Sequence, residues 1–229
     1  MVVRSKRYRE AASKVDRTKA YEALEAIQLL KELPGAKFDE SVEVVIQLGI
    51  DPKKTDQLVR GAVSLPKGLG RDVKVIVFAE GAKADEAKAA GADEVGSADL
   101  AEKIQGGWMD FDIVITSPDM MRHVGKLGKV LGPQGKMPSP KSGTVTPDVA
   151  NAVTEFKAGK VEFRTDAGGN VHAPVGKCSF TAEDLAANLD VFLRHVDAMR
   201  PAAVKGSFLR RVCLSTTMGP GLRLTAGGI

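Results

Sequence analysis

The alternation of apolar and polar positions predicts the first elements of the chain. An apolar residue at every second position predicts a strand over residues 42–50, whose more polar set should face solvent or a partner. Asp51–Pro52 ends this strand. Apolar residues about three positions apart predict a helix before it, with Thr18 as the cap and Pro34–Gly35 as the end. The apolar face of this helix is Tyr21, Leu24, Ile27 and Leu30.

The middle of the chain alternates short apolar strands with helices. We predict strands over residues 73–78, 94–95 and 112–116, and helices over residues 84–90, 99–105 and 148–157. This alternation is typical of a parallel sheet that helices cover on both faces. The segment 125–147 interrupts it, because it is dense in Gly, Pro and Lys and too long for an ordinary connection. We therefore expect it to be functional or to be packed by its own side chains.

The last part of the chain returns to strand-like alternation. Residues 161–165 and 171–173 are predicted strands, joined by a hairpin loop at Asp166–Asn170. A helix is predicted from its cap Thr181 to about Met199, followed by strands over residues 208–215 and 222–225. Two changes of pattern, the linker-like residues 65–70 and Gly159, mark candidate domain boundaries near 66 and 159.

Composition fits a folded chain, with 43% hydrophobic and 27% charged residues. There is no run of eighteen apolar residues and charge begins at residue 4, so we expect neither a membrane span nor a secretory signal. The two cysteines, Cys178 and Cys213, lie far apart, which favours a reduced cytosolic compartment.

Charge is unevenly distributed along the chain. Residues 1–66 hold 12 basic and 10 acidic residues, residues 67–159 hold 12 and 13, and residues 160–229 hold 9 and 6. The basic excess therefore lies outside the middle, which suits an acidic partner at the flanks. Charge alone, however, favours an ordinary solvated surface.

The glycine-rich segments do not match a nucleotide site. A phosphate-binding loop needs a glycine where Val130 stands and a magnesium-binding hydroxyl where Met137 stands. Gly68–Gly70 precedes a predicted strand instead of following one, which is the wrong order for a dinucleotide fingerprint. The histidines and cysteines lack metal-ligand spacing, and Cys178 has no local base. We predict no enzyme activity, no cofactor and no metal; the alternative is a nucleotide-dependent enzyme built on residues 67–159.

Three long motifs carry a family resemblance. They are LGKVLGPQGKMPSPKSGTVT (127–146), AGKVEFRTDAGGNVHAPVGK (158–177) and STTMGPG (215–221), supported by AKFDESVEVVIQLGIDPKK and VRGAVSLPKGLG. Together they resemble the bacterial form of the ribosomal protein L-one family, the stalk protein of the large subunit. The likeness covers nearly the whole chain in the family's order. The chain departs from the family's usual residues at Lys136, Ser139 and Ala167, and the last departure removes one lysine that could meet a phosphate.

The resemblance implies an α/β protein of two domains. A discontinuous α+β domain is expected from residues 1–66 and 160–229, and an inserted Rossmann-like α/β domain with a parallel sheet from residues 67–159. It also implies a non-enzymatic constituent of the large ribosomal subunit, located on the ribosome in the cytoplasm. Such a protein is expected to bind large-subunit rRNA at the mobile stalk, to assist release of deacylated tRNA from the exit site, and to repress translation of its own mRNA through an rRNA-like site. We expect a monomer when free, with no membrane partner.

The resemblance also assigns the tail as the first RNA contact, read through shape and 2′-hydroxyl groups. Small hydroxyls, an adaptable apolar group and a glycine that permits close backbone approach all suit a ribose. These residues are Thr216, Thr217, Met218 and Gly219. Spacing alone favours a buried strand end and a turn at this place.

The other expected contacts fall in three groups. Lys37 should meet a phosphate, Phe38 should stack, and Glu40 should accept from a base amine or a 2′-hydroxyl, with a core position for Phe38 as the alternative. Further contacts are expected from Arg4, Lys6, Arg7, Arg164, His172, Lys205 and Ser207. The alternative for Arg164 is an ion pair with Asp166 that braces the hairpin. Transient contacts with tRNA or rRNA are expected from the lysines of the central domain, which are otherwise solvated residues of a self-packed loop: Lys126, Lys129, Lys136 and Lys141.

Overall fold

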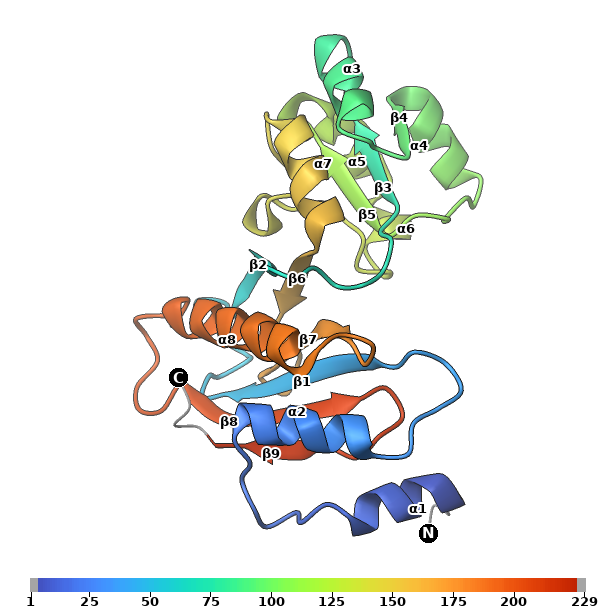
Figure 1. Cartoon of the computed structure of the whole chain (residues 1–229). Coiled ribbons are helices and arrows are strands. Elements are labelled where there is room, and N and C mark those ends of the chain that lie inside the picture. The colour runs from blue at the N-terminus through green and yellow to red at the C-terminus, as the bar shows by residue number, and fades with distance from the viewer. Residues whose placement is uncertain (1–3, 226–229) are drawn as a thin grey trace. The chain divides into compact units, whose positions relative to one another are not determined.

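The computed structural model describes residues 4–225, which form two compact units (Figure 1). Unit 1 combines the described residues up to Gly70 with those from Val161 onwards, and unit 2 comprises Arg71–Lys160. These limits lie close to the two changes of pattern near 66 and 159. Between residues 4 and 225, no helix is long and apolar enough to cross a membrane.

Unit 1 is built on a four-stranded antiparallel sheet in the order β7-β1-β8-β9. The strands are β1 (Ser41–Leu48), β7 (Asn170–Lys177), β8 (Leu209–Thr216) and β9 (Leu222–Leu224). Every second residue of β1 is buried, from Val42 to Leu48. The register pairs Val42 with Thr216 and Leu48 with Leu209, so the start of β1 lies beside the end of β8.

Helices α2 (Ala23–Glu32) and α8 (Ala182–Ala198) cover one face of this sheet (Figure 1). Helix α1 (Lys6–Ser13) precedes them in the chain. Ile27 of α2, Phe192 of α8 and Ala11 of α1 share one apolar core with the inward residues of the strands. The opposite face carries exposed polar residues such as Glu43 and Gln47, so in the described part of the chain it is open.

A second, two-stranded sheet lies in the part of unit 1 where α8 ends. Its strands are β2 (Arg60–Ser64) and β6 (Lys160–Arg164). Phe163 of β6 meets Phe192 edge to face, with ring centroids 5.3 Å apart. Phe163 therefore extends the apolar core of unit 1 to this second sheet.

A buried asparagine fixes the residues that follow β2. Asn188 of α8 is fully buried and accepts a hydrogen bond from the Lys67 amide at 3.0 Å. Its amide group donates to the Gly68 carbonyl at 3.0 Å and to the Val175 carbonyl at 2.8 Å. All the polar atoms of this side chain are thus satisfied, and residues 67–68 are held against α8 and β7.

Unit 2 contains a three-stranded parallel sheet in the order β4-β3-β5. Its main elements are β3 (Val75–Phe78), α3 (Ala82–Ala89), β4 (Glu94–Gly96), α4 (Ala98–Gln105), β5 (Ile113–Thr116) and α7 (Val149–Ala158). On one face of β3, Ile76 and Phe78 pack with residues of α4. On the other face, Val75 and Val77 pack with Phe156 of α7. The prediction of a parallel sheet covered on both faces is confirmed.

The segment 125–147 is packed by its own side chains. The short helices in and before it are η1 (Pro118–Met120), α5 (Met121–Lys126), α6 (Gly128–Leu131) and η2 (Pro140–Ser142). Leu127 and Leu131 are fully buried in the core of unit 2. The Thr144 hydroxyl accepts a hydrogen bond from the Ser139 amide at 2.9 Å and lies 3.0 Å from the Ser142 hydroxyl. Self-packing, one of the two expectations for this segment, is therefore confirmed.

The predicted start of the first helix is wrong. Helix α2 begins at Ala23, and the Thr18 hydroxyl donates to Asp16 at 2.6 Å instead of capping it. Tyr21 lies outside the helix, because its amide donates to the Arg223 carbonyl at 2.8 Å and forms a bridge beside β9. Leu24 was expected on the apolar face but is 50% exposed.

Other boundaries also differ from the predictions. Helix α1 and strand β2 have no counterpart among the predicted elements. Strand β1 ends at Leu48 instead of residue 50, because the Gly49 amide leaves the strand to bond the Phe208 carbonyl at 2.7 Å. Strand β7 runs to Lys177, four residues beyond its predicted end.

Candidate nucleic-acid interface

The sheet of unit 1 separates the expected RNA contacts into two groups. One group lies at the end of the sheet where β1 starts and β8 stops: Arg7, Lys37, Phe38, Glu40 and residues 216–219. The other lies toward the end where β1 stops, around the β6–β7 hairpin and the loop before β8: Arg164, His172, Lys205 and Ser207. At about 3.3 Å per residue, an eight-residue strand separates these ends by roughly 23 Å.

At the first end, the turn after β8 is bound to the start of β1. The Thr217 amide donates to the Ser41 carbonyl at 3.0 Å. In return, the Ser41 amide donates to the Thr217 hydroxyl at 3.0 Å. The turn closes where the Gly219 amide donates to the Thr216 carbonyl at 3.2 Å. The predicted strand end and turn are thus present, and the Thr217 hydroxyl already has a partner within the protein.

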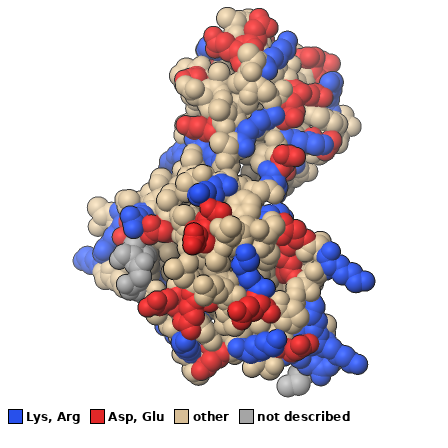
Figure 2. Space-filling model, in the orientation of Figure 1, with Lys and Arg blue, Asp and Glu red and all other residues tan. Residues whose placement is uncertain are grey.

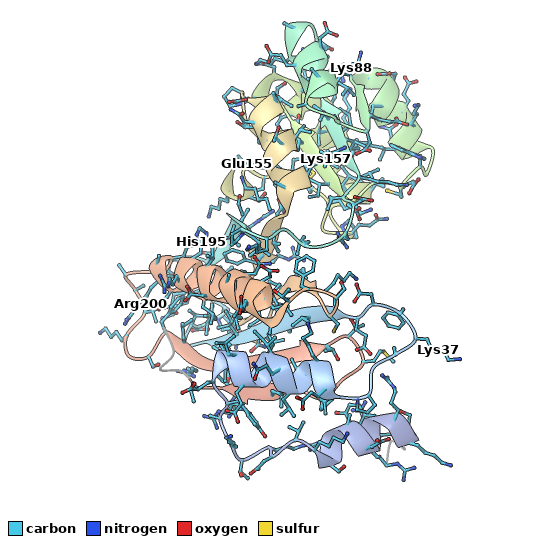
Figure 3. All side chains as sticks on the ribbon, viewed as in Figure 1. Lys37, Lys88, Glu155, Lys157, His195 and Arg200 are labelled. Atoms are coloured by element: carbon cyan, nitrogen blue, oxygen red, sulfur yellow. The ribbon has the colours of Figure 1, made fainter. Side chains whose placement is uncertain are left out.

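Two large apolar side chains are exposed beside this turn. Phe38 is 55% exposed and Met218 is 50% exposed, and the alternative that Phe38 belongs to the core is wrong. A surface cavity of about 210 Å³ is lined by residues of both segments, among them Phe38, Thr216 and Gly219. Lys37 projects outward from the same loop (Figure 3). Exposed apolar groups next to a lysine suit a base or ribose face with a neighbouring phosphate.

Glu40 differs from these neighbours because its carboxylate is buried. It is 3% exposed, accepts a hydrogen bond from the Met218 amide at 2.9 Å, and pairs with Arg7 at 3.3 Å. Burial alone raises the pKa of this carboxyl. Hydrogen bonds from the Met218 amide, the Thr216 hydroxyl and the Ala36 amide outweigh it, so the pKa lies below its ordinary value. Glu40 is therefore ionised at neutral pH.

The basic start of the chain contributes exposed charge near this end. Arg4 and Lys6 are exposed, and the Arg4 guanidinium lies 5.0 Å from the centre of the Tyr8 ring. The Ser5 hydroxyl caps α1 by accepting from the Tyr8 amide at 3.2 Å. Lys and Arg side chains gather around α1 at the lower edge of unit 1 (Figure 2).

At the second end, Asp166 braces the hairpin between β6 and β7. It accepts hydrogen bonds from the Asn170 amide at 2.7 Å and the Gly168 amide at 2.8 Å. The hydrogen bonds from Asn170 lower the pKa of Asp166 to about 2. The ring nitrogen of His172 lies 3.3 Å from the Asp166 carboxylate, and the alternative partner Arg164 does not pair with it. Arg164 is exposed at the end of β6.

The loop before β8 presents the remaining two expected residues of this end. Lys205 and Ser207 are both exposed. The Ser207 hydroxyl donates to the Leu209 carbonyl at 3.1 Å, so its oxygen stays available as an acceptor.

The open face of the sheet connects the two ends and carries two arginines absent from the expected contacts. The register places His172 opposite Val45, Val45 opposite Cys213, and Cys213 opposite Arg223, in one row across four strands. Arg211 lies two residues from Cys213 on the same face of β8. Both arginines are exposed. Arg223 lies between the buried residues Leu222 and Leu224, so the alternation that predicted β1 was a sufficient signal for it, whereas Arg211 follows the exposed Arg210.

In unit 2, the segment from residue 120 to 147 contains no Asp or Glu. Lys126, Lys129 and Lys141 are exposed along it. Lys136 differs, because its ammonium group donates to the carbonyls of Met109 and Phe111 and lies 4.7 Å from the centre of the Phe111 ring. Three of the four lysines thus remain available to an anionic partner, and Lys136 has partners within the unit.

No group of three or more metal-ligating side chains occurs among residues 4–225. Both cysteines are free thiols, and burial raises the pKa of Cys178 and of Cys213. Neither is therefore an activated nucleophile at neutral pH.

Comparison with known proteins gives consistent matches. A sequence model of the ribosomal protein L1p/L10e family matches residues 30–220. The chain is 58% identical over 224 residues to the large ribosomal subunit protein uL1 of Kosmotoga olearia, covering 98% of this chain and 97% of that protein. It is also 58% identical over 220 residues to the large ribosomal subunit protein uL1 of Bordetella pertussis, covering 96% and 95%. Both relatives are named as ribosomal proteins and not as enzymes.

Proposed function

Because the chain belongs to the ribosomal protein L1p/L10e family, we propose that unit 1 is the part of the chain that binds large-subunit rRNA. As a member of this family, the chain is a constituent of the large ribosomal subunit and not an enzyme, and its place is on the ribosome in the cytoplasm. The proposed contact surface runs from the Phe38–Met218 end, across the open face of the sheet, to the hairpin end.

The observation that carries this proposal is that Phe38 and Met218 are both exposed at the end of the sheet where the turn after β8 is fixed to β1. Exposed apolar side chains normally cost solubility, so two at one end of a sheet mark a contact surface. Ribose and base faces are apolar, whereas the backbone and hydroxyl groups of residues 216–219 offer partners to 2′-hydroxyls. The arginines of the open face add charge for phosphates along the same surface.

Two finer roles follow from the same proposal. The exposed lysines of unit 2, Lys126, Lys129 and Lys141, suit a weak contact with the phosphates of an exit-site tRNA during its release. Repression of the protein's own mRNA requires no second surface, because an mRNA that folds like the rRNA site would compete for unit 1. The rRNA and the mRNA should therefore exclude one another.

The test is a titration of the full chain with a large-subunit stalk rRNA fragment at several salt concentrations. We expect Met218→Ala and Thr217→Val each to lower affinity about tenfold, or 1.4 kcal/mol. Met218→Ala removes an exposed contact, and Thr217→Val leaves the Ser41 amide without the hydroxyl that holds the turn. Leu24→Ala is the matched control: Leu24 is equally exposed, but it lies on helix α2, on the covered side of the sheet. Equal effects of the three substitutions would refute the assignment of the surface.

Charge substitutions separate the roles of the two units. Arg211→Gln and Arg223→Gln should each reduce the salt dependence of rRNA binding by about one unit on the log–log scale, because each removes one phosphate contact. Lys126→Gln with Lys129→Gln should leave rRNA binding unchanged and weaken binding of deacylated tRNA. Loss of rRNA binding in the double lysine variant would move the rRNA surface to unit 2.

A further inference from the structure

Glu40 joins three segments that are distant in the sequence. Its carboxylate accepts hydrogen bonds from the Ala36 amide in the loop before β1 and from the Met218 amide after β8. It also pairs with Arg7 of helix α1 at 3.3 Å. The side chain of Glu40 is almost fully buried, so its carboxylate meets these partners and little solvent.

Arg7 also joins the loop before β1 to the turn after β8. Its guanidinium donates to the Pro34 carbonyl at 3.3 Å and to the Met218 carbonyl at 3.5 Å. Met218 is therefore held at both backbone groups, the amide by Glu40 and the carbonyl by Arg7. The planar guanidinium can serve two carbonyls and a carboxylate together, which an ammonium group cannot do in this geometry.

Glu40 is among the residues that line the surface cavity, but it is only 3% exposed and its carboxylate is occupied by partners within the protein. To reach a base, the side chain would have to abandon two backbone amides and an arginine, and buried donors without partners are costly. The Thr216 hydroxyl also helps to lower the pKa of this carboxyl. Phe38 lies two residues before this buried group and Met218 is bound to it through its amide, and both side chains are exposed.

We propose that Glu40 and Arg7 are positioning residues, which fix Phe38 and the Met218 turn in their RNA-binding arrangement before RNA arrives and do not contact the RNA. This inference rests on the proposed function of unit 1 and deepens it. A turn that is already fixed loses less conformational freedom on binding, so more of the contact energy appears as affinity.

The first arm of the test uses the free protein. In Glu40→Gln, one of the two amides that meet the carboxylate faces an NH2 group, and we expect amide hydrogen exchange at Met218 to accelerate at least tenfold. Glu10→Gln is the matched control, because Glu10 is an exposed acid on the same helix as Arg7. Unchanged exchange at Met218 in Glu40→Gln would overturn the proposal, and this arm needs no RNA.

The second arm measures binding of the stalk rRNA fragment at several salt concentrations. We expect Glu40→Gln to lower affinity about tenfold with the salt dependence of the wild-type chain, because no phosphate contact is removed. Glu10→Gln should leave affinity within twofold. If Glu40→Gln lowers affinity while amide hydrogen exchange at Met218 stays at the wild-type rate, Glu40 contacts the RNA directly and the proposal is wrong.

Arg7→Lys keeps the inference testable even where Glu40→Gln fails to fold. A direct phosphate contact would survive this change, because the charge is retained. A positioning role predicts about a tenfold loss of affinity in Arg7→Lys, with unchanged salt dependence and faster exchange at Met218. Near wild-type affinity in Arg7→Lys would refute the positioning role of Arg7. A wild-type chain that fails to bind the fragment would instead refute the function proposed for unit 1.

Discussion

Gly219→Ala is expected to damage unit 1 although it adds only one methyl group. The new Cβ would lie 2.3 Å from the Thr216 hydroxyl oxygen, far inside any contact that carbon and oxygen can make. Either the turn or the Thr216 side chain must move by about 1 Å to restore an ordinary separation of about 3.4 Å. Because Gly219 does not have a positive φ, steric overlap and not backbone strain is the cause.

The magnitude follows from the partner that Thr216 would lose. Its hydroxyl is one of the groups that lower the pKa of the Glu40 carboxyl. An interaction with a charged group is worth about 1.5–3 kcal/mol, so we expect Gly219→Ala to lower the free energy of unfolding of unit 1 by about 2 kcal/mol. Since the displaced turn carries Met218, RNA affinity should fall by at least tenfold.

Gly221→Ala provides the matched control for this substitution. Nothing lies within 4 Å of a Cβ at Gly221, so the same methyl group should change stability by less than about 0.5 kcal/mol. Stability is measured by urea unfolding followed through hydrogen exchange of unit 1 peptides. A Gly219→Ala variant as stable as Gly221→Ala would refute the reasoning. In a Thr216→Ala background, the cost of Gly219→Ala should shrink, because the atom that it meets is absent.

Three further outcomes test the packing and charge of the two units. Asn188→Ala should destabilise unit 1 by about 3 kcal/mol in urea unfolding, because it removes all three hydrogen bonds of a buried side chain; a loss below 1 kcal/mol would contradict this. The stability difference between wild type and Asp166→Asn should be fully present above pH 4 and disappear as the pH falls toward 2, since the folded pKa of Asp166 is depressed to about 2; a pH-independent difference would argue against it. Lys136→Met should destabilise unit 2 by about 1–2 kcal/mol, monitored by the fluorescence of Trp108, whereas Lys129→Met should not.

Elements with a strong local pattern were predictable from the sequence. The period-two alternation of β1 and the capped amphipathic helix α8 appear where they were expected. The start of α2 was not predictable in the same way. Thr18 is a good capping residue by type, but its hydroxyl donates to Asp16 instead. The Tyr21 amide donates to the Arg223 carbonyl of strand β9, about 200 residues later. Long-range pairing thus outweighs a local cap worth about 1 kcal/mol.

The candidate site shows the same division between local and long-range information. The exposure of Lys37 and the turn at Gly219 agree with expectations drawn from their segments alone. The burial of Glu40 depends on Arg7, 33 residues earlier, and on Met218, 178 residues later. A glutamate before a strand normally faces solvent, so no local pattern distinguishes this one from an exposed acceptor.

Some basic side chains are paired within the protein, so the basic excess of the chain overstates the charge that is available to RNA. In the flanks Arg7 is neutralised by Glu40, and in the middle of the chain Lys136 is bound to backbone carbonyls, so a count of basic residues overstates the number of phosphate contacts. The charge that remains exposed on unit 1 is spread over α1, the Lys37 loop and the open face of the sheet, with the acidic Glu43 among it. We therefore expect the salt dependence of RNA binding to be shallower than the basic count implies. Affinity should rest more on the fixed shape of the Phe38–Met218 end, which salt does not screen.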